Sequence, residues 1–515
     1  MEGKIKTAEN SVCFYLEKFA LQTFLSTAIS YSCCEIAIKW ENKMIYTDTR
    51  DSNVKVDFRT AVMNGMNSST GGLYIPIDFP KLEKSFINKN PEPSFRDVAF
   101  NMAKPYVEGE IPDEDLMAII QDAYPFTPKV VPLDSVSYIL ELFHGPTCAF
   151  KDFGARFMAR VMSYFNRTEN GTLHILVATS GDTGSAVGSA FHNVPGLDVT
   201  ILYPEGKISY IQEKQLSTFT GNVRALKVKG TFDDCQKLVK TAFTDSDLRK
   251  EFRLSSANSI NISRLLPQSF YYMYSSLVVR NRAELDSKIE NPDILMSVPS
   301  GNFGNLTSGL IAREMGAPIK GFIAATNENK TIPDWIATGN YDARPSVETY
   351  ANAMDVGAPS NYERIKAMYS LEQVREFFAS YWLDNDGIKD AIYKCNQKTG
   401  YIIDPHGAIA WQAWNDIKNG AMQELKNGNK NDWQKTGLTP NLPCWADSVI
   451  DKKAVCVILE TAHPAKFGSI VSEVIGREPA IPERLQEVMA LPDNAISMEN
   501  DYKKFKEWLE NNLAK

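Results

Sequence analysis

The strongest constraint on the fold of this chain is a repeated order of elements. In each repeat a buried strand leads into a polar loop and then into a helix. Residues 174–178 (HILVA) lead into the loop TSGDTG and a helical stretch. Residues 294–298 (ILMSV) lead into PSGNFGN, and residues 454–460 (AVCVILE) lead into TAHP, each before another helical stretch. Strands that alternate with helices form βαβ units, so the pattern predicts an α/β fold with a parallel sheet covered on both faces. We expect a ligand at the carboxyl ends of those strands, where the loops gather.

The stretch 137–165 is the most specific example of this order. Alternating apolar residues at its beginning predict a strand, and apolar residues from Phe153 onward recur at helical spacing. Asp152 is placed to cap that helix. Lys151 lies between two phenylalanines at the helix start, where lost hydration would lower the pKa of its amine. Such a lysine is suited to imine formation with an aldehyde, although most lysines beside aromatic residues are surface residues with buried stems.

Two glycine-rich loops open helices, SGDTGSA at 180–186 and SGNFGN at 300–305. Glycine lets the backbone approach an anion, and the amides and dipole at a helix start favour negative charge. Strand-to-helix turns also use glycine for geometry alone, so each loop is weak support by itself. Together with a desolvated lysine, the two loops indicate a ligand with two anionic ends. Neither loop has dinucleotide or P-loop spacing, and no GxSxG turn supports a serine hydrolase.

Three histidines, His144, His406 and His463, lie in predicted loops, and Thr461 lies close to the last of them. A loop histidine is more often a hydrogen-bonded structural residue than a catalyst, and a threonine before a helix more often caps it. The chain has five histidines and none in an HExxH spacing, so we predict no metal site.

Composition argues against several other classes of protein. The 515 residues are 43% hydrophobic and 23% charged, which is typical of a globular protein with several domain-sized units. The net charge of −8 argues against nucleic acid and against an anionic membrane surface as partners, and no apolar run is long enough to span a bilayer. The eight cysteines are scattered without CxxC pairs, which is the pattern of a reduced, cytoplasmic protein.

The chain divides into three predicted segments. Residues 1–43 mix apolar and charged residues, and we expect this extension to be dispensable for the fold and for catalysis. Residues 44–132 are predicted to form a small mixed domain, and residues 133–515 carry the strand–loop–helix pattern. Within the last segment, residues 415–452 are rich in Asn, Lys, Gly and Pro, which predicts a solvated insertion.

Several of these motifs together resemble the threonine synthase family of pyridoxal-phosphate enzymes. The segment FHGPTCAFKDFGARF is similar to the family's cofactor-lysine segment. The likeness covers almost everything after Met44 and continues through TGGLY, ATSGDTGSA, SSANSINISRLLPQSFYY, SVPSGNFGN, NAMDVGAPSNYERI, DPHGAIA and TAHPAKFG. It implies an α/β enzyme of fold type II, similar to tryptophan synthase β, with two lobes around the cofactor and a small amino-terminal domain.

The resemblance also implies roles for particular residues. Lys151 would bond covalently to pyridoxal 5'-phosphate and later move protons at Cα and Cβ of the substrate, while Thr461 would hydrogen-bond the pyridine nitrogen. Backbone amides would hold the cofactor phosphate, from Gly301, Asn302, Phe303, Gly304 and Asn305. The substrate carboxylate would lie against Ser180, Gly181, Asp182, Thr183 and Gly184, with Asp182 near the phenolic oxygen of the ring. Arg156 is a candidate for the substrate phosphate.

The implied activity is that of a carbon–oxygen lyase acting on phosphates, which converts O-phospho-L-homoserine and water into L-threonine and phosphate. A related phospho-lyase that gives 2-oxobutyrate would share the same motifs. A ligand-binding relic of the fold is disfavoured, because the lysine, both loops and Thr461 are present. With this small-molecule substrate we expect a monomer or homodimer. The chain departs from the family pattern before Met44, in the 415–452 insertion, and at Lys330, where an aspartate is usual.

Overall fold

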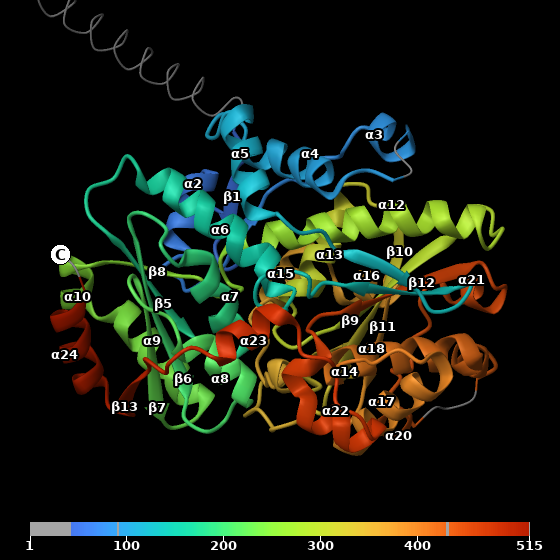
Figure 1. Cartoon of the computed structure of the whole chain (residues 1–515). Helices are drawn as coiled ribbons and strands as arrows, with labels where there is room; N and C mark the ends of the chain where they lie inside the picture. The colour runs from blue at the N-terminus through green and yellow to red at the C-terminus, as the bar shows by residue number, and fades with distance from the viewer. Residues whose placement is uncertain (1–42, 90–91, 429–431, 514–515) are drawn as a thin grey trace, which may run out of the picture.

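Most strands assemble into two large sheets, and each of these forms the centre of one lobe (Figure 1). A third sheet is an antiparallel pair of short strands in the amino-terminal part. The computed structural model describes residues 43–89, 92–428 and 432–513. In the larger lobe the strand order is β11-β10-β9-β12-β4-β3, and β3 is antiparallel to β4 while the other pairs are parallel. These strands are β3 (Lys129–Pro132), β4 (Ser137–Glu141), β9 (Asp293–Pro299), β10 (Ile319–Thr326), β11 (Phe378–Trp382) and β12 (Ala454–Glu460).

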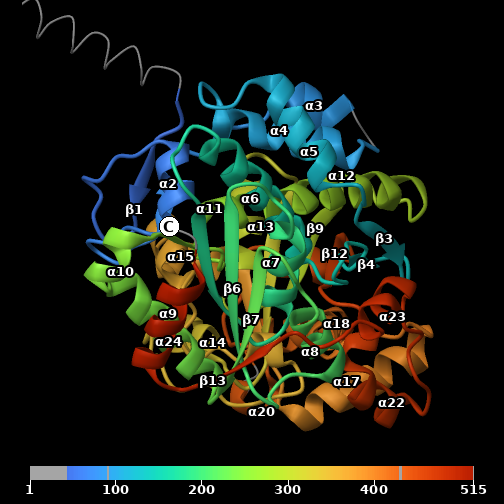
Figure 2. The ribbon, with the colours of Figure 1, turned by 60° about the vertical axis from the view of Figure 1, so that its left-hand side comes forward.

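The smaller lobe holds a five-stranded sheet in the order β13-β7-β6-β5-β8, with every neighbouring pair parallel. Its strands are β5 (Leu173–Ala178), β6 (Leu197–Pro204), β7 (Val223–Lys229), β8 (Arg253–Ser256) and β13 (Ile496–Glu499). Figure 2 shows the helices on both of its faces. The helices of this lobe are α7 (Asp182–Phe191), α8 (Tyr210–Ser217), α9 (Phe232–Thr244), α10 (Ser246–Glu251) and α24 (Tyr502–Asn512).

The larger lobe is also covered on both faces, because alternate strand residues face opposite cores. Val457 of β12 lies in a core with α12, whereas its neighbour Ile458 lies in a second core with α18. The helices of this lobe are α12 (Ser269–Leu285), α13 (Gly304–Glu314), α14 (Thr331–Thr338), α15 (Tyr362–Met368), α16 (Leu371–Phe377), α17 (Asn385–Thr399), α18 (Pro405–Asp416), α19 (Met422–Lys426), α20 (Trp433–Thr436), α21 (Ala446–Ile450) and α22 (Gly468–Ile475). Three other helices pack toward the smaller lobe: α6 (Lys151–Asn166) on α7, α11 (Ile262–Leu265) on α6, and α23 (Glu483–Met489) on α8. The α/β fold and the parallel sheets predicted from the sequence are therefore confirmed.

The amino-terminal part packs on the helix that begins at Lys151. It contains β1 (Tyr46–Asp48), α2 (Phe58–Asn64), β2 (Tyr74–Pro76), α3 (Lys84–Lys89), α4 (Phe95–Val107) and α5 (Asp113–Ala123). The Tyr124 hydroxyl donates to the Phe153 carbonyl at 3.0 Å, and the rings of Phe95 and Phe153 lie 5.3 Å apart. β3, which precedes the predicted boundary at 132, pairs with β4 inside the larger sheet. The prediction about the extension 1–43 lies outside the described residues except at its last position.

The segment 415–452 is not solvated throughout, so that prediction is wrong for part of it. Leu438 and Trp445 are almost completely buried in the core that also holds α18 and β11. The Trp445 indole donates to the Phe377 carbonyl at 2.9 Å, and Thr439 exchanges hydrogen bonds with Ser380 of β11. This part of the segment therefore covers the edge strand of the larger sheet, where unpaired backbone groups would otherwise face water.

Candidate active site

Two neighbouring strands bring Lys151 beside Thr461. β4 and β12 are parallel and in register, and the loops that follow them continue side by side. The Phe150 amide donates to the Thr461 carbonyl at 2.8 Å, and the His463 amide donates to the Cys148 carbonyl at 3.0 Å. The two segments thus form a short antiparallel bridge at the carboxyl ends of their strands. Lys151 is the first residue of α6, immediately after this bridge.

The pKa of the Lys151 amine is lowered to about 8, as its position in the sequence predicted. Burial is the main cause; the Asp182 carboxylate opposes it, and the positive charges of Arg264 and Lys466 add to it. Lys151 as a whole is only partly buried, so part of the residue is accessible to solvent. The Lys151 ammonium nitrogen lies 5.8 Å from the centre of the Phe150 ring.

Asp152 does not cap α6, contrary to the prediction. It is the second residue of the helix and completely buried, and its carboxylate accepts hydrogen bonds from the Thr147 amide at 2.9 Å and the Thr147 hydroxyl at 2.7 Å. Burial raises the pKa of Asp152 to about 6. A Cβ on Gly145 would lie 2.4 Å from the Asp152 carboxylate, so this turn requires glycine. Asp152 therefore fixes the loop that leads to Lys151.

The loop 300–305 presents free backbone amides. No amide from Gly301 to Asn305 has a hydrogen-bond partner among the described residues, and Phe303 has a left-handed backbone with φ of 58°. The side chains hold the loop in place: Asn302 donates to the Ser259 hydroxyl at 2.6 Å. The side-chain oxygen of Asn305 accepts from Tyr271 and Tyr272 at 2.6 and 2.8 Å. A preorganised set of unpartnered amides at the start of α13 is suited to an anionic phosphate.

The loop 180–184 has fewer free amides than the loop 300–305, although the two loops looked equivalent in the sequence. The Thr179 hydroxyl oxygen accepts from the amides of Gly181 and Gly184, at 3.0 and 2.8 Å. This loop also carries the carboxylate of Asp182, which is 3% exposed. Burial alone would raise the pKa of Asp182, but the charges of Lys466 and Lys151 and its hydrogen bonds outweigh burial, so the pKa is well below its usual value.

Lys466 completes the charged cluster, and sequence reasoning missed it. It is 1% exposed, its ammonium lies 2.7 Å from the Asp182 carboxylate, and it donates to the Thr147 carbonyl at 3.1 Å. The available signal was a lysine inside the apolar TAHPAKFG segment. Asp404 was also missed: its buried carboxylate accepts from the Ala462 amide at 3.0 Å and so fixes the backbone next to Thr461.

Arg156 is not brought to this cluster. Its guanidinium donates to the carbonyls of Ala123 and Asp122, each at 2.7 Å, and thereby binds the carboxyl end of α5. Its guanidinium therefore packs the amino-terminal part against α6 and lies away from the charged cluster.

The loop histidines have structural hydrogen bonds. His406 lies 3.0 Å from the Asp404 carboxylate and accepts from the Ala353 amide at 3.2 Å. His463 accepts from the Ala465 amide at 3.2 Å, and burial lowers its pKa to about 4. These contacts fit the structural interpretation of loop histidines. Among the described residues there is no group of side chains that could hold a metal ion, and no helix long and apolar enough to cross a membrane.

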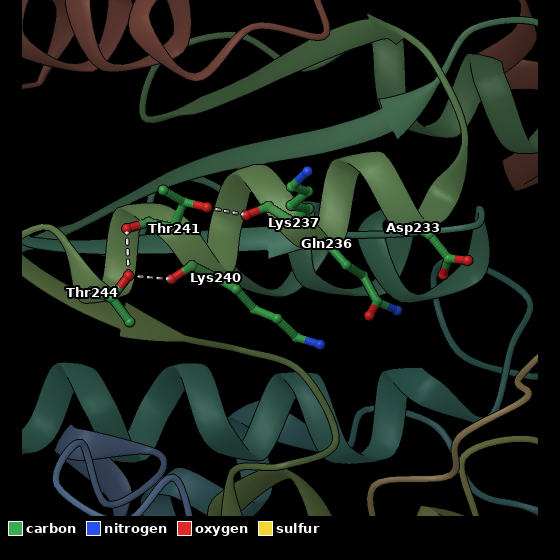
Figure 3. Close-up of a pocket in the computed structure, with 6 residues that line it drawn as sticks. All are labelled: Asp233, Gln236, Lys237, Lys240, Thr241 and Thr244. Carbon is green, nitrogen blue, oxygen red and sulfur yellow. Dashed lines mark hydrogen bonds between the residues drawn. The ribbon is translucent and has the colours of Figure 1, made fainter. Parts of the chain in front are cut away.

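A shallow pocket of about 460 Å³ lies elsewhere, on the outer face of α9 (Figure 3). Its lysines, Lys237 and Lys240, are exposed, and the Thr241 hydroxyl donates to the Lys237 carbonyl at 2.7 Å within the helix. None of the predicted site residues lines it; it is lined by Asp233, Gln236, Lys237, Lys240, Thr241 and Thr244.

Three family models match consecutive parts of the chain. The threonine synthase N terminus matches residues 45–124, the pyridoxal-phosphate dependent enzyme model matches 127–430, and the C-terminal threonine synthase model matches 444–509. The threonine synthase of Buchnera aphidicola subsp. Baizongia pistaciae is 38% identical over 460 residues, which cover 88% of this chain and 97% of that protein.

Solved structures give the same result. The crystal structure of threonine synthase from Escherichia coli matches with a TM-score of 0.76 and 35% identity, over 91% of this chain and 100% of that one. The structure of pyridoxal-phosphate-bound threonine synthase from Brucella melitensis matches with a TM-score of 0.77 and 31% identity, over 91% and 99%. The expected resemblance, fold type and cofactor are thereby confirmed, and the chain belongs to the threonine synthase family of pyridoxal-phosphate-dependent lyases.

Proposed function

We propose that this enzyme converts O-phospho-L-homoserine and water into L-threonine and phosphate. The observation that carries the proposal is the placement of an enclosed, deprotonatable Lys151 beside Thr461 and Asp182, where the two lobes meet. In the net reaction phosphate leaves Cγ, the hydroxyl of water adds at Cβ, and one proton passes from Cβ to Cγ. The remaining proton of water goes to the phosphate.

The residues present fit pyridoxal phosphate. Lys151 offers an amine to an aldehyde, and the unpartnered amides of 301–305 offer a cradle to the phosphate. A Cβ added at Gly301 would lie 2.6 Å from Met354 Cα, so the backbone there leaves no room for a side chain on the cradle. When bound, the cofactor supplies an electron sink that makes the protons at Cα and then Cβ acidic.

The chain's own residues would bind, orient and move protons. Lys151 would hold the cofactor covalently and, once its amine is free, take the proton from Cα and then from Cβ. Thr461, with its backbone fixed by hydrogen bonds on both sides, would face the pyridine nitrogen. The substrate carboxylate would bind at Ser180 to Gly184, through the Ser180 hydroxyl and the amides that Thr179 leaves free. Burial of the cluster would exclude water until phosphate has left.

The difference between the loops supports their assignment to separate anions. A phosphate, with its higher charge, gains more from a loop in which no amide is already used. We also propose a monomer or homodimer in the cytoplasm. Because β3 belongs to the larger sheet, the small amino-terminal unit would end before Lys129 rather than at residue 132.

The test is product identification with the purified full chain and O-phospho-L-homoserine. We expect L-threonine and phosphate in equal amounts; 2-oxobutyrate would instead identify a phospho-lyase. Lys151→Ala should carry no covalently bound cofactor and have no turnover. An unchanged rate in that variant would refute the proposed role of Lys151.

A further inference from the structure

Lys466 joins the two lobes inside the site. It follows β12 of the larger sheet, in a short 3₁₀ turn (Pro464–Phe467), while Asp182 begins the helix after β5 of the smaller sheet. Their charged groups lie 2.7 Å apart, and both side chains are almost completely buried. The Gln212 amide also donates to the Asp182 carboxylate, at 2.9 Å, from α8. A buried carboxylate needs such partners, because an unpaired charge in this environment is strongly destabilising.

One carboxylate therefore lies within range of two lysines. Asp182 forms its ion pair with Lys466, while Lys151 makes no ion pair in the described part of the chain. Asp182 nevertheless raises the pKa of Lys151, and Lys466 lowers it. Lys466 and Lys151 are the two cations that lower the pKa of Asp182, so without Lys466 the ammonium of Lys151 would be the remaining one.

We propose that Lys466 is a positioning residue that holds the Asp182 carboxylate in an ion pair of its own, so that Lys151 keeps a free amine for the aldehyde of the cofactor. This inference rests on the proposed role of Lys151 as the cofactor lysine. In the step at stake, the ammonium first releases a proton to solvent. The nitrogen lone pair then bonds to the aldehyde carbon, and the two amine hydrogens leave with the aldehyde oxygen as water.

Other charged or titratable groups face the two lysines without forming ion pairs with them. Arg264 comes from α11, Asp152 from α6, and Cys148 from the loop before Lys151. Arg264 lowers the pKa of Lys151 in the same direction as Lys466. Asp182 is thus the acidic partner for which the two lysines compete, and the competition can be tested by removing its members separately.

The experiment measures the initial rate of covalent attachment of pyridoxal phosphate against pH, trapped by borohydride and located by peptide mass spectrometry. The full chain is compared with Lys466→Met, Asp182→Asn and the double variant, and circular dichroism confirms that each is folded. In Lys466→Met the midpoint of the pH profile should rise by roughly one to two pH units, because Lys151 then pairs with Asp182. In Asp182→Asn the midpoint should fall.

The double variant separates this role from simple packing. Without Asp182 there is no carboxylate to hold Lys151 protonated, so the midpoint should return to the wild-type value or below it. An unchanged midpoint in folded Lys466→Met, or a double variant that keeps the upward shift, would overturn the inference. If Lys466→Met does not fold, the fall of the pH midpoint expected in Asp182→Asn is the test of the inference, and an unchanged midpoint there would overturn it. Attachment at a residue other than Lys151 in the wild-type chain would instead refute the proposed function.

Discussion

Replacing Gly301 by alanine tests the phosphate cradle at a position where the backbone cannot adjust. The added Cβ would lie 2.6 Å from Met354 Cα and 3.0 Å from the Ala353 carbonyl oxygen. Both contacts are with backbone atoms, so either the 352–354 turn or the cradle itself must move. The Ala353 amide is itself held by His406, which restricts the turn and directs the displacement toward the cradle.

The expected loss follows from the number of amides displaced. A hydrogen bond to a charged group contributes about 1.5–3 kcal/mol, so one lost amide should weaken cofactor binding by about 10- to 150-fold. Equilibrium titration of the stripped protein with pyridoxal phosphate measures this dissociation constant directly. The loss should appear in cofactor affinity before any change in the KM for substrate.

Gly304→Ala is the matched control. Its Cβ would meet side-chain atoms, Ser259 Cβ at 3.2 Å and Asn361 Nδ2 at 3.3 Å, which can shift by tenths of an ångström. The affinity should fall by less than about tenfold, which corresponds to roughly 1.4 kcal/mol. Ser180→Ala should keep the cofactor and raise the KM for substrate. Equal losses in the two glycine variants would refute the steric argument, and loss of cofactor in Ser180→Ala alone would mean that the loops are exchanged.

Three further changes test other parts of the structure. Arg156→Gln should lower the free energy of unfolding by about 1–3 kcal/mol in urea titrations, because the carboxyl end of α5 loses its hydrogen bonds to the guanidinium. The KM for substrate should not change; a raised KM would indicate that Arg156 contacts the substrate. Burial raises the pKa of Asp355 from 3.8 to about 7. The folded chain then binds an extra proton between these values, so its stability falls as pH rises across that window, and Asp355→Asn should remove this component of the pH dependence. Lys330→Met should remove cation–π contacts worth about 0.5–2 kcal/mol and speed hydrogen exchange in α20; unchanged exchange would contradict this.

The strands and the buried lysine at the start of α6 were predictable because their signals are local. An uninterrupted apolar run such as 454–459 is compatible with a strand buried on both faces, and β12 contains those residues and Glu460. Lys151 was identified from its aromatic neighbours and its place at a strand-to-helix turn, which are also local features. The difference in free amides between the two glycine loops was not predictable, because nothing in the sequence indicates that the Thr179 hydroxyl accepts from two amides of the first loop.

Side-chain direction explains why Arg156 lies away from the charged cluster and why Lys466 was missed. Arg156 is five residues beyond Lys151, and five residues turn an α-helix by about 500°, so the two side chains diverge by about 140°. Although it is close to Lys151 in the sequence, Arg156 therefore lies on a different face of α6, against α5. Lys466 and Asp182 are almost three hundred positions apart in the chain but meet because both follow strands whose carboxyl ends face each other. Only the packing of the two lobes contains that information.

Two positions that the resemblance marked as departures from the family pattern contact each other in the structure. The resemblance led us to expect an aspartate at 330, but the Lys330 ammonium lies 3.5 Å from the centre of the Trp382 ring and 5.4 Å from that of Trp433. Trp433 belongs to the 415–452 segment, and its carbonyl accepts from the Trp382 indole at 3.1 Å. A carboxylate at 330 would face the negative surfaces of both rings, whereas an ammonium is attracted to them. Lys330 and the 415–452 segment therefore support each other: the segment supplies one of the two rings, and the lysine links it to β11, the edge strand of the larger sheet.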